Sequence, residues 1–575
     1  MEVLLLIIVC GGGFLLAYHT YGKFLANKIF KLDKNASVPS YELQDGIDYV
    51  PAKKGIIFGH HYTSIAGTGP IVGPAIGIIW GWVPAILWVV FGSIFMGAVH
   101  DLGALVVSMR NDGKSISDIT SKYINGRVRF IFFVIVFMAL LIVIAIFGMV
   151  IAIVFDRFPS SVIPVWLQIP IAITLGFAVY KKGANVVTST VVAVIAMYLC
   201  IWLGSLHGDF KMPEFFGIPA TGVWTIILLG YAWVASTLPV TTLLQPRDYI
   251  NAWQLFIIMG FLVVGAATSA ITGGMEIVAP ALNLTPAGAP SLWPFLFITI
   301  ACGAVSGFHS LVASGTSPKQ ISNEKDCLFV GYGSMLLEGV LAILIILCVA
   351  AGIGMAYKTA GGEILSGSNA WNHHYASWAG ATGMNAKLGA VVIGASNMMQ
   401  TLGIKEIVGI TLMGVFIASF AGTTLDTSVR IQRYIIAELA TDLKLKPLAN
   451  RWVATTIAVV SAAALAFATG ANGKGALKLW PLFGAVNQLL AALALLIVTL
   501  YLKRKGGMKF LVSGIPCVLM LAITNWAMVE NEIIFYNNKD WLLVTIGGGI
   551  FVLALWVTVE ALLTFVGGRK TVSPT

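Results

Sequence analysis

Hydrophobic runs of about 20 residues recur along the whole chain, and this pattern constrains the fold more than any other feature. A helix needs about 20 apolar residues to cross the roughly 30 Å hydrocarbon core of a bilayer. Hydrophobic residues make up 58% of the 575 residues and charged residues only 10%, whereas soluble domains carry about 25% charged residues. The sequence therefore predicts an all-α integral membrane protein.

The runs predict about fifteen membrane helices. The first run has no basic segment ahead of it and no small-residue cleavage site after it, so we interpret it as a membrane helix and not as a secretory signal. The segment 388–401 is short and rich in Gly, Asn and Met, which favours a re-entrant or surface helix. The fifteen predicted spans lie near 2–22, 56–78, 83–109, 129–154, 162–180, 186–206, 222–246, 252–274, 292–315, 327–356, 407–429, 452–470, 477–501, 510–529 and 541–566.

The distribution of lysine and arginine predicts the orientation, because the cytoplasmic loops of membrane proteins are enriched in them. An N-terminus outside the cell places 27 of the 35 basic residues in cytoplasmic segments and leaves eight on the other face. The C-terminus is then cytoplasmic. The net charge of +10 follows from this topology and from contact with anionic lipid, and it gives no reason to expect a nucleic acid partner.

The span 56–78 contains a sequence that a regular helix does not accommodate. Residues 59–74 read GHHYTSIAGTGPIVGP; proline lacks a backbone donor, and glycine favours unwinding. Unpaired backbone groups in hydrocarbon cost several kcal/mol each, so they are tolerated where they face a cavity, an ion or a ligand. We interpret this span as a broken helix that forms a binding site; the alternative is a kink satisfied by neighbouring helices.

A second such sequence occurs five spans later. Residues 230–242 of the span 222–246 read GYAWVASTLPVTT, and this span is predicted to cross in the opposite direction. Two broken helices related in this way are typical of transporters with inverted repeats. We predict a transport core over 56–440, with a first repeat over 56–206 and a second from 222.

The remaining segments are expected to lie outside this core. Residues 1–55 form the first membrane helix and a cytoplasmic loop, and 451–566 form the C-terminal helices. We expect these helices to brace the core or to form a homo-oligomer contact, with Asn487 and Gln488 hydrogen-bonding between helices.

Several strings in the sequence resemble the carbon starvation protein A family of prokaryotic inner-membrane transporters. The resemblance implies transport of small nutrients, since members have been described as peptide transporters and as proton-coupled pyruvate transporters. It also implies the leucine-transporter-type fold of the amino acid, polyamine and organocation superfamily. The strings are residues 59–74, MGAVHDLGAL at 96–105, SMR at 108–110, QPRDYI at 245–250, GFHSLVASGT at 307–316 and TTLDTSVR at 423–430.

The two predicted breaks are the expected substrate site. Helix ends there would present free backbone amides to a carboxylate. We favour a small carboxylate such as pyruvate over a peptide, because the breaks contain no acidic residue to bind a peptide amine. A nutrient sensor would bind a similar ligand and stays a lesser alternative, whereas no phosphate-binding loop or catalytic motif supports a pump or an enzyme. The candidate substrate-binding residues are Thr63, Ser64, Gly67, Thr68, Gly69, Ser236 and Thr237.

Transport against a gradient requires a coupling ion, and the sequence leaves two possibilities. Ionisable residues within membrane spans are functional candidates by default; the proton-coupling candidates are Asp101, His60, His61, His100 and His309. In sodium-coupled members of the fold that the resemblance implies, a cation lies beside an Ala-x-x-Thr-Ser string, which here is Ala313, Thr316 and Ser317. The family's described proton-driven pyruvate uptake favours protons. No cofactor and no further metal is expected.

Other polar residues are predicted to be structural or to form gates. Asp426 and Arg430 are four residues apart and share a helix face, so we expect a stabilising pair or an internal gate. Arg247 and Asp248 are expected to form an inner-face anchor or gate. Residues 371–375 read WNHHY, which favours an aromatic cluster over a metal site, and the six cysteines are expected to be small buried hydrophobic residues.

Overall fold

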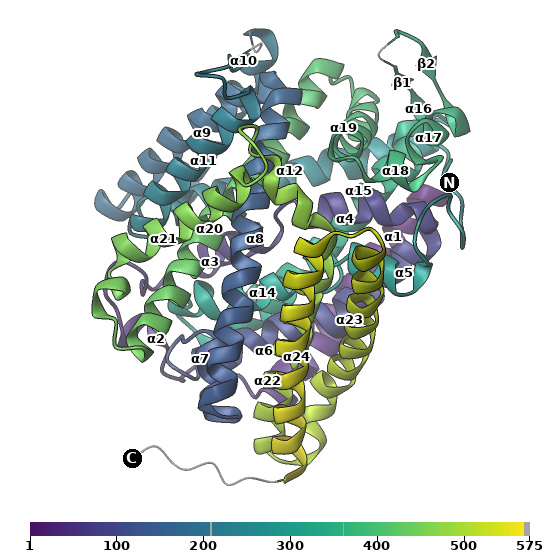
Figure 1. The fold of residues 1–575 in the computed structure, drawn as a ribbon. Helices are drawn as coiled ribbons and strands as arrows, with labels where there is room; N and C mark the ends of the chain where they lie inside the picture. Colours follow the sequence, from purple (N-terminus) through teal and green to yellow (C-terminus); the bar gives the residue numbers. More distant parts are fainter. Residues whose placement is uncertain (208–209, 360, 568–575) are drawn as a thin grey trace.

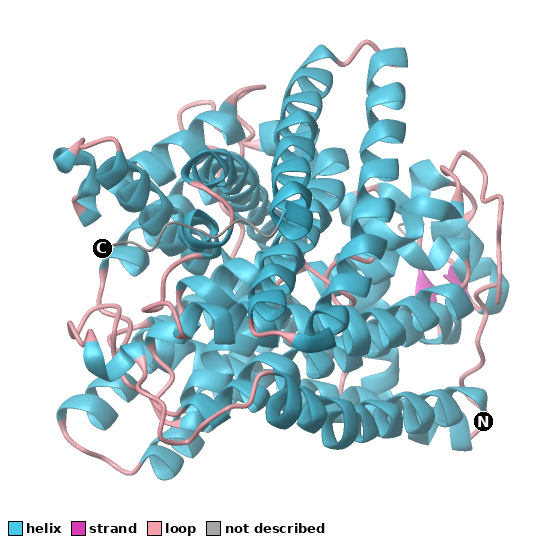
Figure 2. Cartoon of the chain, turned by 90° about the horizontal axis from the view of Figure 1, so that it is seen from below, coloured by secondary structure: helices cyan, strands magenta, loops and turns pink. Residues whose placement is uncertain are grey.

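The computed structural model describes residues 1–207, 210–359 and 361–567, and the side chains of residues 207 and 384–386 lie outside this description. Residues 569–570, two of the 27 basic residues assigned to the cytoplasmic side, also lie outside it. Helices account for nearly all regular structure in the described part, as the cyan ribbons of Figure 2 show. In chain order the helices of the first half are α1 (Glu2–Ala17), α2 (Pro39–Glu42), α3 (Lys54–Ile65), α4 (Gly69–Gly77), α5 (Trp82–Gly92), α6 (Ala98–Met109), α7 (Ile116–Tyr123), α8 (Gly126–Arg157), α9 (Val162–Gly176), α10 (Val186–His207), α11 (Ala220–Thr237) and α12 (Leu244–Ile271).

The second half has the same character. A two-stranded antiparallel hairpin of β1 (Tyr357–Lys358) and β2 (Ile364–Leu365) interrupts its helices. The helices are α13 (Leu292–Thr299), α14 (Gly307–Gly315), α15 (Ser334–Leu347), α16 (Ile353–Met355), α17 (Gly367–Tyr375), α18 (Trp378–Thr382), α19 (Met384–Gln400), α20 (Glu406–Asp442), α21 (Arg451–Phe467), α22 (Trp480–Arg504), α23 (Leu511–Asn537) and α24 (Trp541–Gly567).

Twelve helical segments in the described part of the chain are long and apolar enough to cross a bilayer, and α3 with α4 would be a thirteenth if counted as one bent span. Each of the fifteen predicted runs contains helix. The run at 452–470 is the shorter apolar helix α21, of 17 residues, and the run at 292–315 is divided between α13 and α14. The segment 388–401 lies almost entirely in α19, which packs against α12 and α20 and is largely buried there, so the prediction of a surface helix was wrong.

The distribution of apolar residues is that of a membrane protein. Large hydrophobic side chains are exposed along α1, α10, α23 and α24, where lipid replaces water as the neighbour. Charged and polar side chains are instead buried in the interior, Asp101, His309 and Glu338 among them, each fully inaccessible. Such burial is costly unless the groups pair, so the interior is the place to look for function.

The break predicted in the span 56–78 is confirmed. α3 ends at Ile65 and α4 begins at Gly69, and their axes differ by 43°. Residues 66–68 lie between the two helices, and Pro70, which has no amide hydrogen to donate, stands in the first turn of α4, where a helix tolerates proline. Glycine is needed here for close approach: a Cβ added at Gly67 would overlap Thr424, and one at Gly69 would overlap Cys302.

The second break is not where the sequence placed it. α11 ends at Thr237 and α12 begins at Leu244, so 222–246 is not one broken span: Pro239 lies in the turn that connects two successive helices. The span 292–315, predicted to be continuous, is broken instead at residues 300–306, between α13 and α14. The limits of the two repeats remain a prediction.

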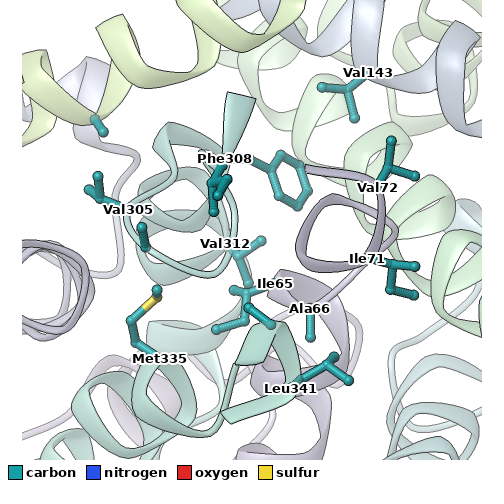
Figure 3. Packing of buried hydrophobic residues seen from close by; sticks show 14 of the residues in the cluster. Ile65, Ala66, Ile71, Val72, Val143, Val305, Phe308, Val312, Met335 and Leu341 are labelled. Carbon is teal, nitrogen blue, oxygen red and sulfur yellow. The ribbon is translucent and has the colours of Figure 1, made fainter. Parts of the chain in front are cut away.

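The two breaks lie against each other. Gly73 of α4 packs closely on the carbonyl of Thr299, and Gly303 approaches Pro70. Figure 3 shows Ile65 and Ala66 at the first break near Val312 of α14 and Leu341 of α15. The long helices α8 and α20 pack along each other beside them. Unwound backbone from two membrane helices thus meets in the interior.

The basic segments predicted to be cytoplasmic meet on one face of the molecule. The amide of Val50 donates to the carbonyl of Lys319, 3.1 Å away, and Arg504 donates to the carbonyl of Lys122 at 3.0 Å. α2 and α7 lie at this lower face in Figure 1, whereas α17, α18 and the β1–β2 hairpin lie at the upper face. We call the lower face the basic face and the upper one the opposite face.

Candidate functional site

A chain of acidic and imidazole side chains lies beside the second break. Asp101 of α6 lies between two histidines: its Oδ1 is 2.7 Å from His100 Nδ1, and its Oδ2 is 3.0 Å from His309 Nδ1. His309 Nε2 is 3.1 Å from Glu338 Oε2, and Glu338 Oε1 accepts a hydrogen bond of 3.0 Å from the Gly303 amide. Both nitrogens of the His309 ring therefore lie within salt-bridge distance of a carboxylate, and the contact of Nδ1 has hydrogen-bond geometry. The three helices α6, α14 and α15 bring these residues together.

The break itself is held by the C-terminal helix α22. Asn487 Oδ1 accepts from the Phe308 amide at 2.9 Å, and Asn487 Nδ2 donates to Ser306 Oγ at 3.0 Å. The Phe308 amide, a donor without a helical partner at the start of α14, is satisfied in this way, as a buried amide requires. The expectation that Asn487 hydrogen-bonds between helices is confirmed, and its partners lie at the break.

A cavity of about 720 Å³ opens from the opposite face and reaches both breaks. Gly69 and Cys302 line it at the breaks, and Trp378, Lys387 and Trp480 line it elsewhere. The cavity is comparable in size to known small-molecule sites, which span about 300 to 1,000 Å³. Cys302 is also close to the ionisable chain, because its Sγ, a His309 nitrogen and a Glu338 oxygen lie within 4.8 Å of one another. The cavity thus leads to the charged chain.

Cys302, His309 and Glu338 are the only group with metal-ligand spacing in the described part of the chain. We do not interpret them as metal ligands, since carboxylate oxygens lie within salt-bridge distance of both ring nitrogens of His309. Residues 371–375 form no such group; the rings of Trp371 and Tyr375 stack with centroids 4.2 Å apart, as an aromatic cluster. All six cysteines are free thiols, and five are buried.

A second charged network lies nearer the basic face. His60 Nδ1 is 2.6 Å from Asp248 Oδ2, and Asp248 Oδ1 accepts from Arg247 Nη2 at 2.9 Å. The other Arg247 amino group donates to Asp426, and Tyr231 donates to Asp426 Oδ2 at 3.1 Å. Arg247 and Asp248 are thus buried between α3, α11 and α20, and do not anchor the chain at the surface.

The predicted pair of Asp426 and Arg430 is not formed. Arg430 Nη1 donates to Asp48 Oδ1 at 2.6 Å, and its Nη2 donates to the carbonyl of Ala235 at 3.1 Å. Arg433, one turn on, donates to both oxygens of Asp48 at 2.8 Å. The pairing prediction was wrong because each side chain found a partner on another segment: Asp426 on α12, and Arg430 in the loop before α3.

The hydroxyl groups predicted to bind substrate lie in two places, at the first break and at the end of α11. Ser64 Oγ lies 3.2 Å from Thr427 Oγ1 of α20, and Ser236 Oγ donates to the carbonyl of Asp426 at 2.8 Å. The hydroxyls of Thr63 and Thr237 donate to carbonyls of their own helices. Thr68, Gly67 and Gly69 lie at the first break.

The residues predicted to bind a cation lie in α14 and directly after it, where this segment packs against α3. Ser317 Oγ is 2.7 Å from His61 Nδ1, and the hydroxyl of Thr316 is buried with no hydrogen-bond partner among the described residues. Ala313 is buried in α14. The hydroxyl that reaches the first break comes from α20, where Thr424 donates to the carbonyl of Ser64 at 3.3 Å. Which set binds an ion stays a prediction.

Sequence reasoning did not single out several residues of the site. Cys302 and Gly303 lie in a span with no proline at its centre, so nothing local marked the break. Lys387 and Asn531 belong to segments predicted to be a loop and a brace. Glu338 was not among the candidates, because its spacing from Asp101 in the sequence carries no signal of the contact through His309.

Comparison with known proteins agrees with this architecture. The family model described as carbon starvation protein CstA matches residues 2–527. A protein named peptide transporter CstA from Helicobacter pylori strain 26695 is 33% identical over 574 residues, which cover 91% of this chain and 81% of that protein. The pyruvate/proton symporter BtsT of Escherichia coli is 30% identical over 588 residues, covering 92% of this chain and 81% of BtsT.

Among solved structures, a manganese transporter of Eremococcus coleocola is similar with a TM-score of 0.52 at 11% identity, covering 91% of this chain and 99% of that one. This likeness shows the leucine-transporter-type fold. With the curated relatives, it makes the chain a multi-pass membrane transporter of a small molecule. The chain belongs to the carbon starvation protein CstA family.

Proposed function

We propose that the protein is a secondary active transporter that imports a small carboxylate such as pyruvate together with a proton. The observation that carries this proposal is the chain Asp101–His309–Glu338, buried in the membrane interior and adjacent to the two helix breaks. Histidine titrates near neutral pH more readily than any other side chain. A proton shared along this chain would be bound and released as the breaks rearrange.

The mechanism requires that proton and substrate reach the same region. Cys302 lines the cavity, and the next residue, Gly303, donates its amide to Glu338. A change in the 300–306 segment on substrate binding would therefore alter the environment of Glu338. This link would couple the two bound species without direct contact between them.

The second candidate is peptide transport, which one observation favours. Asp540 is the only carboxylate that lines the cavity among the described residues, and it would suit the amino group of a peptide. The sequence argument that no acidic residue is available therefore applies to the breaks but not to the cavity mouth.

Uptake by the purified protein in liposomes tests the proposal. Labelled pyruvate and di- and tripeptides are compared, with proton or sodium gradients imposed separately. We expect a proton gradient to drive pyruvate accumulation and Glu338→Gln or Asp101→Asn to abolish it. Glu560→Gln is the matched control, since Glu560 pairs with Asn125 elsewhere in the molecule. Peptide uptake without pyruvate uptake, and its loss in Asp540→Asn, would favour the second candidate.

The same assay separates the two coupling ions. If sodium alone drives accumulation, and Thr316→Ala abolishes it while Asp101→Asn does not, the proton proposal is wrong. A protein that binds the ligand but carries no flux under any gradient would be a sensor. We expect no enzymatic turnover of the substrate.

The orientation and assembly belong to this proposal as well. We place the protein in the cell membrane of a prokaryote, with its N-terminus outside and its C-terminus in the cytoplasm, because the basic segments gather on one face. The cavity then opens outward. Contact between copies through the C-terminal helices would make a homo-oligomer, with their exposed apolar side chains as the contact surface.

A further inference from the structure

A buried lysine with no carboxylate partner among the described residues lines the cavity. Lys387 of α19 is 2% exposed, and its Nζ lies 5.2 Å from the centre of the Trp480 ring. No described carboxylate lies within salt-bridge distance of it. Burial lowers the pKa of Lys387 to about 7. A buried ammonium without a counter-ion is costly, so an anionic ligand in this cavity would supply the missing partner.

A second polar side chain lines the same cavity. Asn531 of α23 is 4% exposed and lines the cavity, and its Nδ2 is buried with no hydrogen-bond partner among the described residues. Buried polar groups are nearly always satisfied, so an orphaned amide donor at a cavity wall points to a ligand acceptor. The two donors come from helices far apart in the sequence.

The rest of the wall is mainly apolar. Phe295, Trp378, Trp480 and Phe483 line it, with the backbone breaks at Gly69 and Cys302. Such a wall suits a short carbon skeleton. For an anionic solute it offers the two donors, and Asp540 is the one described carboxylate in the lining.

We propose that Lys387 and Asn531 form a carboxylate-recognition site in the cavity, where the substrate binds before it reaches the helix breaks. Lys387 binds the carboxylate, and Asn531 donates to a carbonyl oxygen of the same ligand. The ligand class is a short carboxylate that carries a carbonyl group, as a 2-oxo acid or a small peptide does. This site deepens the proposed transport function and rests on it.

Transport kinetics test the site. In liposomes, Lys387→Gln is expected to raise the KM for pyruvate about tenfold, the cost of a lost charge-assisted hydrogen bond, while kcat changes less than twofold. Lys387→Arg keeps the charge and is expected to restore most of the affinity. Asn531→Leu is expected to raise KM with the same small effect on kcat. The control is Lys405→Gln, an exposed lysine after α19 that does not line the cavity.

Ligand chemistry provides the second arm. Pyruvamide, which lacks the charge, is expected to compete poorly with pyruvate in the wild type and equally poorly in Lys387→Gln. An unchanged KM in Lys387→Gln, or competition by pyruvamide as strong as that by pyruvate, would overturn the proposal. The same comparison is made with a dipeptide and its C-terminal amide if peptides are the transported species.

Binding to the purified protein separates failure of this site from failure of the transport proposal. The shift in thermal unfolding temperature on adding pyruvate or a dipeptide is measured for wild type and Lys387→Gln. A shift that Lys387→Gln abolishes supports the site even if no flux is observed. Flux in the wild type that persists with the same KM in Lys387→Gln refutes the site and leaves the transport function intact.

Discussion

At the residue scale, buried charges in this protein are neutralised by partners on other segments. Asp48 contacts both Arg430 and Arg433. Burial by itself would raise the pKa of Asp48, but Arg430, Arg433 and Lys319 outweigh it and hold that pKa well below its ordinary value. The loop before α3 is thereby fixed to α20 at the basic face.

Asp48→Asn is expected to lower the free energy of unfolding by about 3 kcal/mol, because Arg430 stays buried without its counter-charge. Since the pKa of Asp48 is depressed in the folded state, its stabilising contribution is present above the ordinary aspartate range and is lost as the pH falls below about 4. Thermal unfolding in detergent between pH 3 and 8 measures the stability lost in Asp48→Asn and the pH dependence of the wild type. Asp156→Asn, at an exposed position on α8, serves as control; equal effects of the two substitutions would contradict this account.

At the element scale, the breaks depend on the absence of side chains at the contact between α4 and the 300–306 segment. A Cβ at Gly69 would overlap the Cys302 side chain, and relieving that overlap would push α4 away from the second break. Gly69→Ala is expected to reduce the initial rate of pyruvate uptake at least about tenfold, as misplacement of about 1 Å at a site can cost more than that.

Gly230→Ala is the matched comparison for that prediction. Gly230 lies within α11, and an added Cβ there meets nothing within 4 Å. Replacing an unobstructed helical glycine by alanine favours the helix by up to about 1 kcal/mol, so uptake should be unchanged and stability equal or higher. Loss of uptake in both variants to the same degree would show that the contact at Gly69 has no special role.

At the scale of the whole molecule, the C-terminal helices are joined to the core through α22. Asn487 contacts Ser306 at the end of the second break and Phe308 in the first turn of α14, so its loss is expected to disturb the break as well as the packing of the C-terminal helices. Asn487→Ala is expected to lower the unfolding temperature and also to raise the KM about three- to tenfold, because unsatisfied donors at the break cost about 1 to 3 kcal/mol.

Thr499→Val separates these two effects. Thr499 lies on the same helix and is 2.9 Å from Ser513 Oγ of α23, away from the breaks. It should lower stability while leaving KM as in the wild type. An unchanged KM in Asn487→Ala would show that the C-terminal helices only brace the core.

The sequence by itself determined the membrane class, the approximate positions of the helices and the first break, since each depends on neighbours along the chain. Hydrophobic length sets a span, and Gly67, Gly69 and Pro70 interrupt one locally. The family strings add the transporter assignment. None of these features requires knowledge of which helices pack together.

Only the tertiary structure decided which groups pair with the buried charges and with the unwound backbone amides. Asp426 pairs with Arg247, 179 positions away, and Arg430 with Asp48, 382 positions away, although their own spacing favoured a pair on one helix. The second break lies at 300–306 because Asn487 and Glu338 satisfy its backbone amides, and the local sequence contains no proline to mark it. Buried charges and unwound amides are stable only with partners that the fold brings near, so their positions follow from packing and not from sequence neighbours.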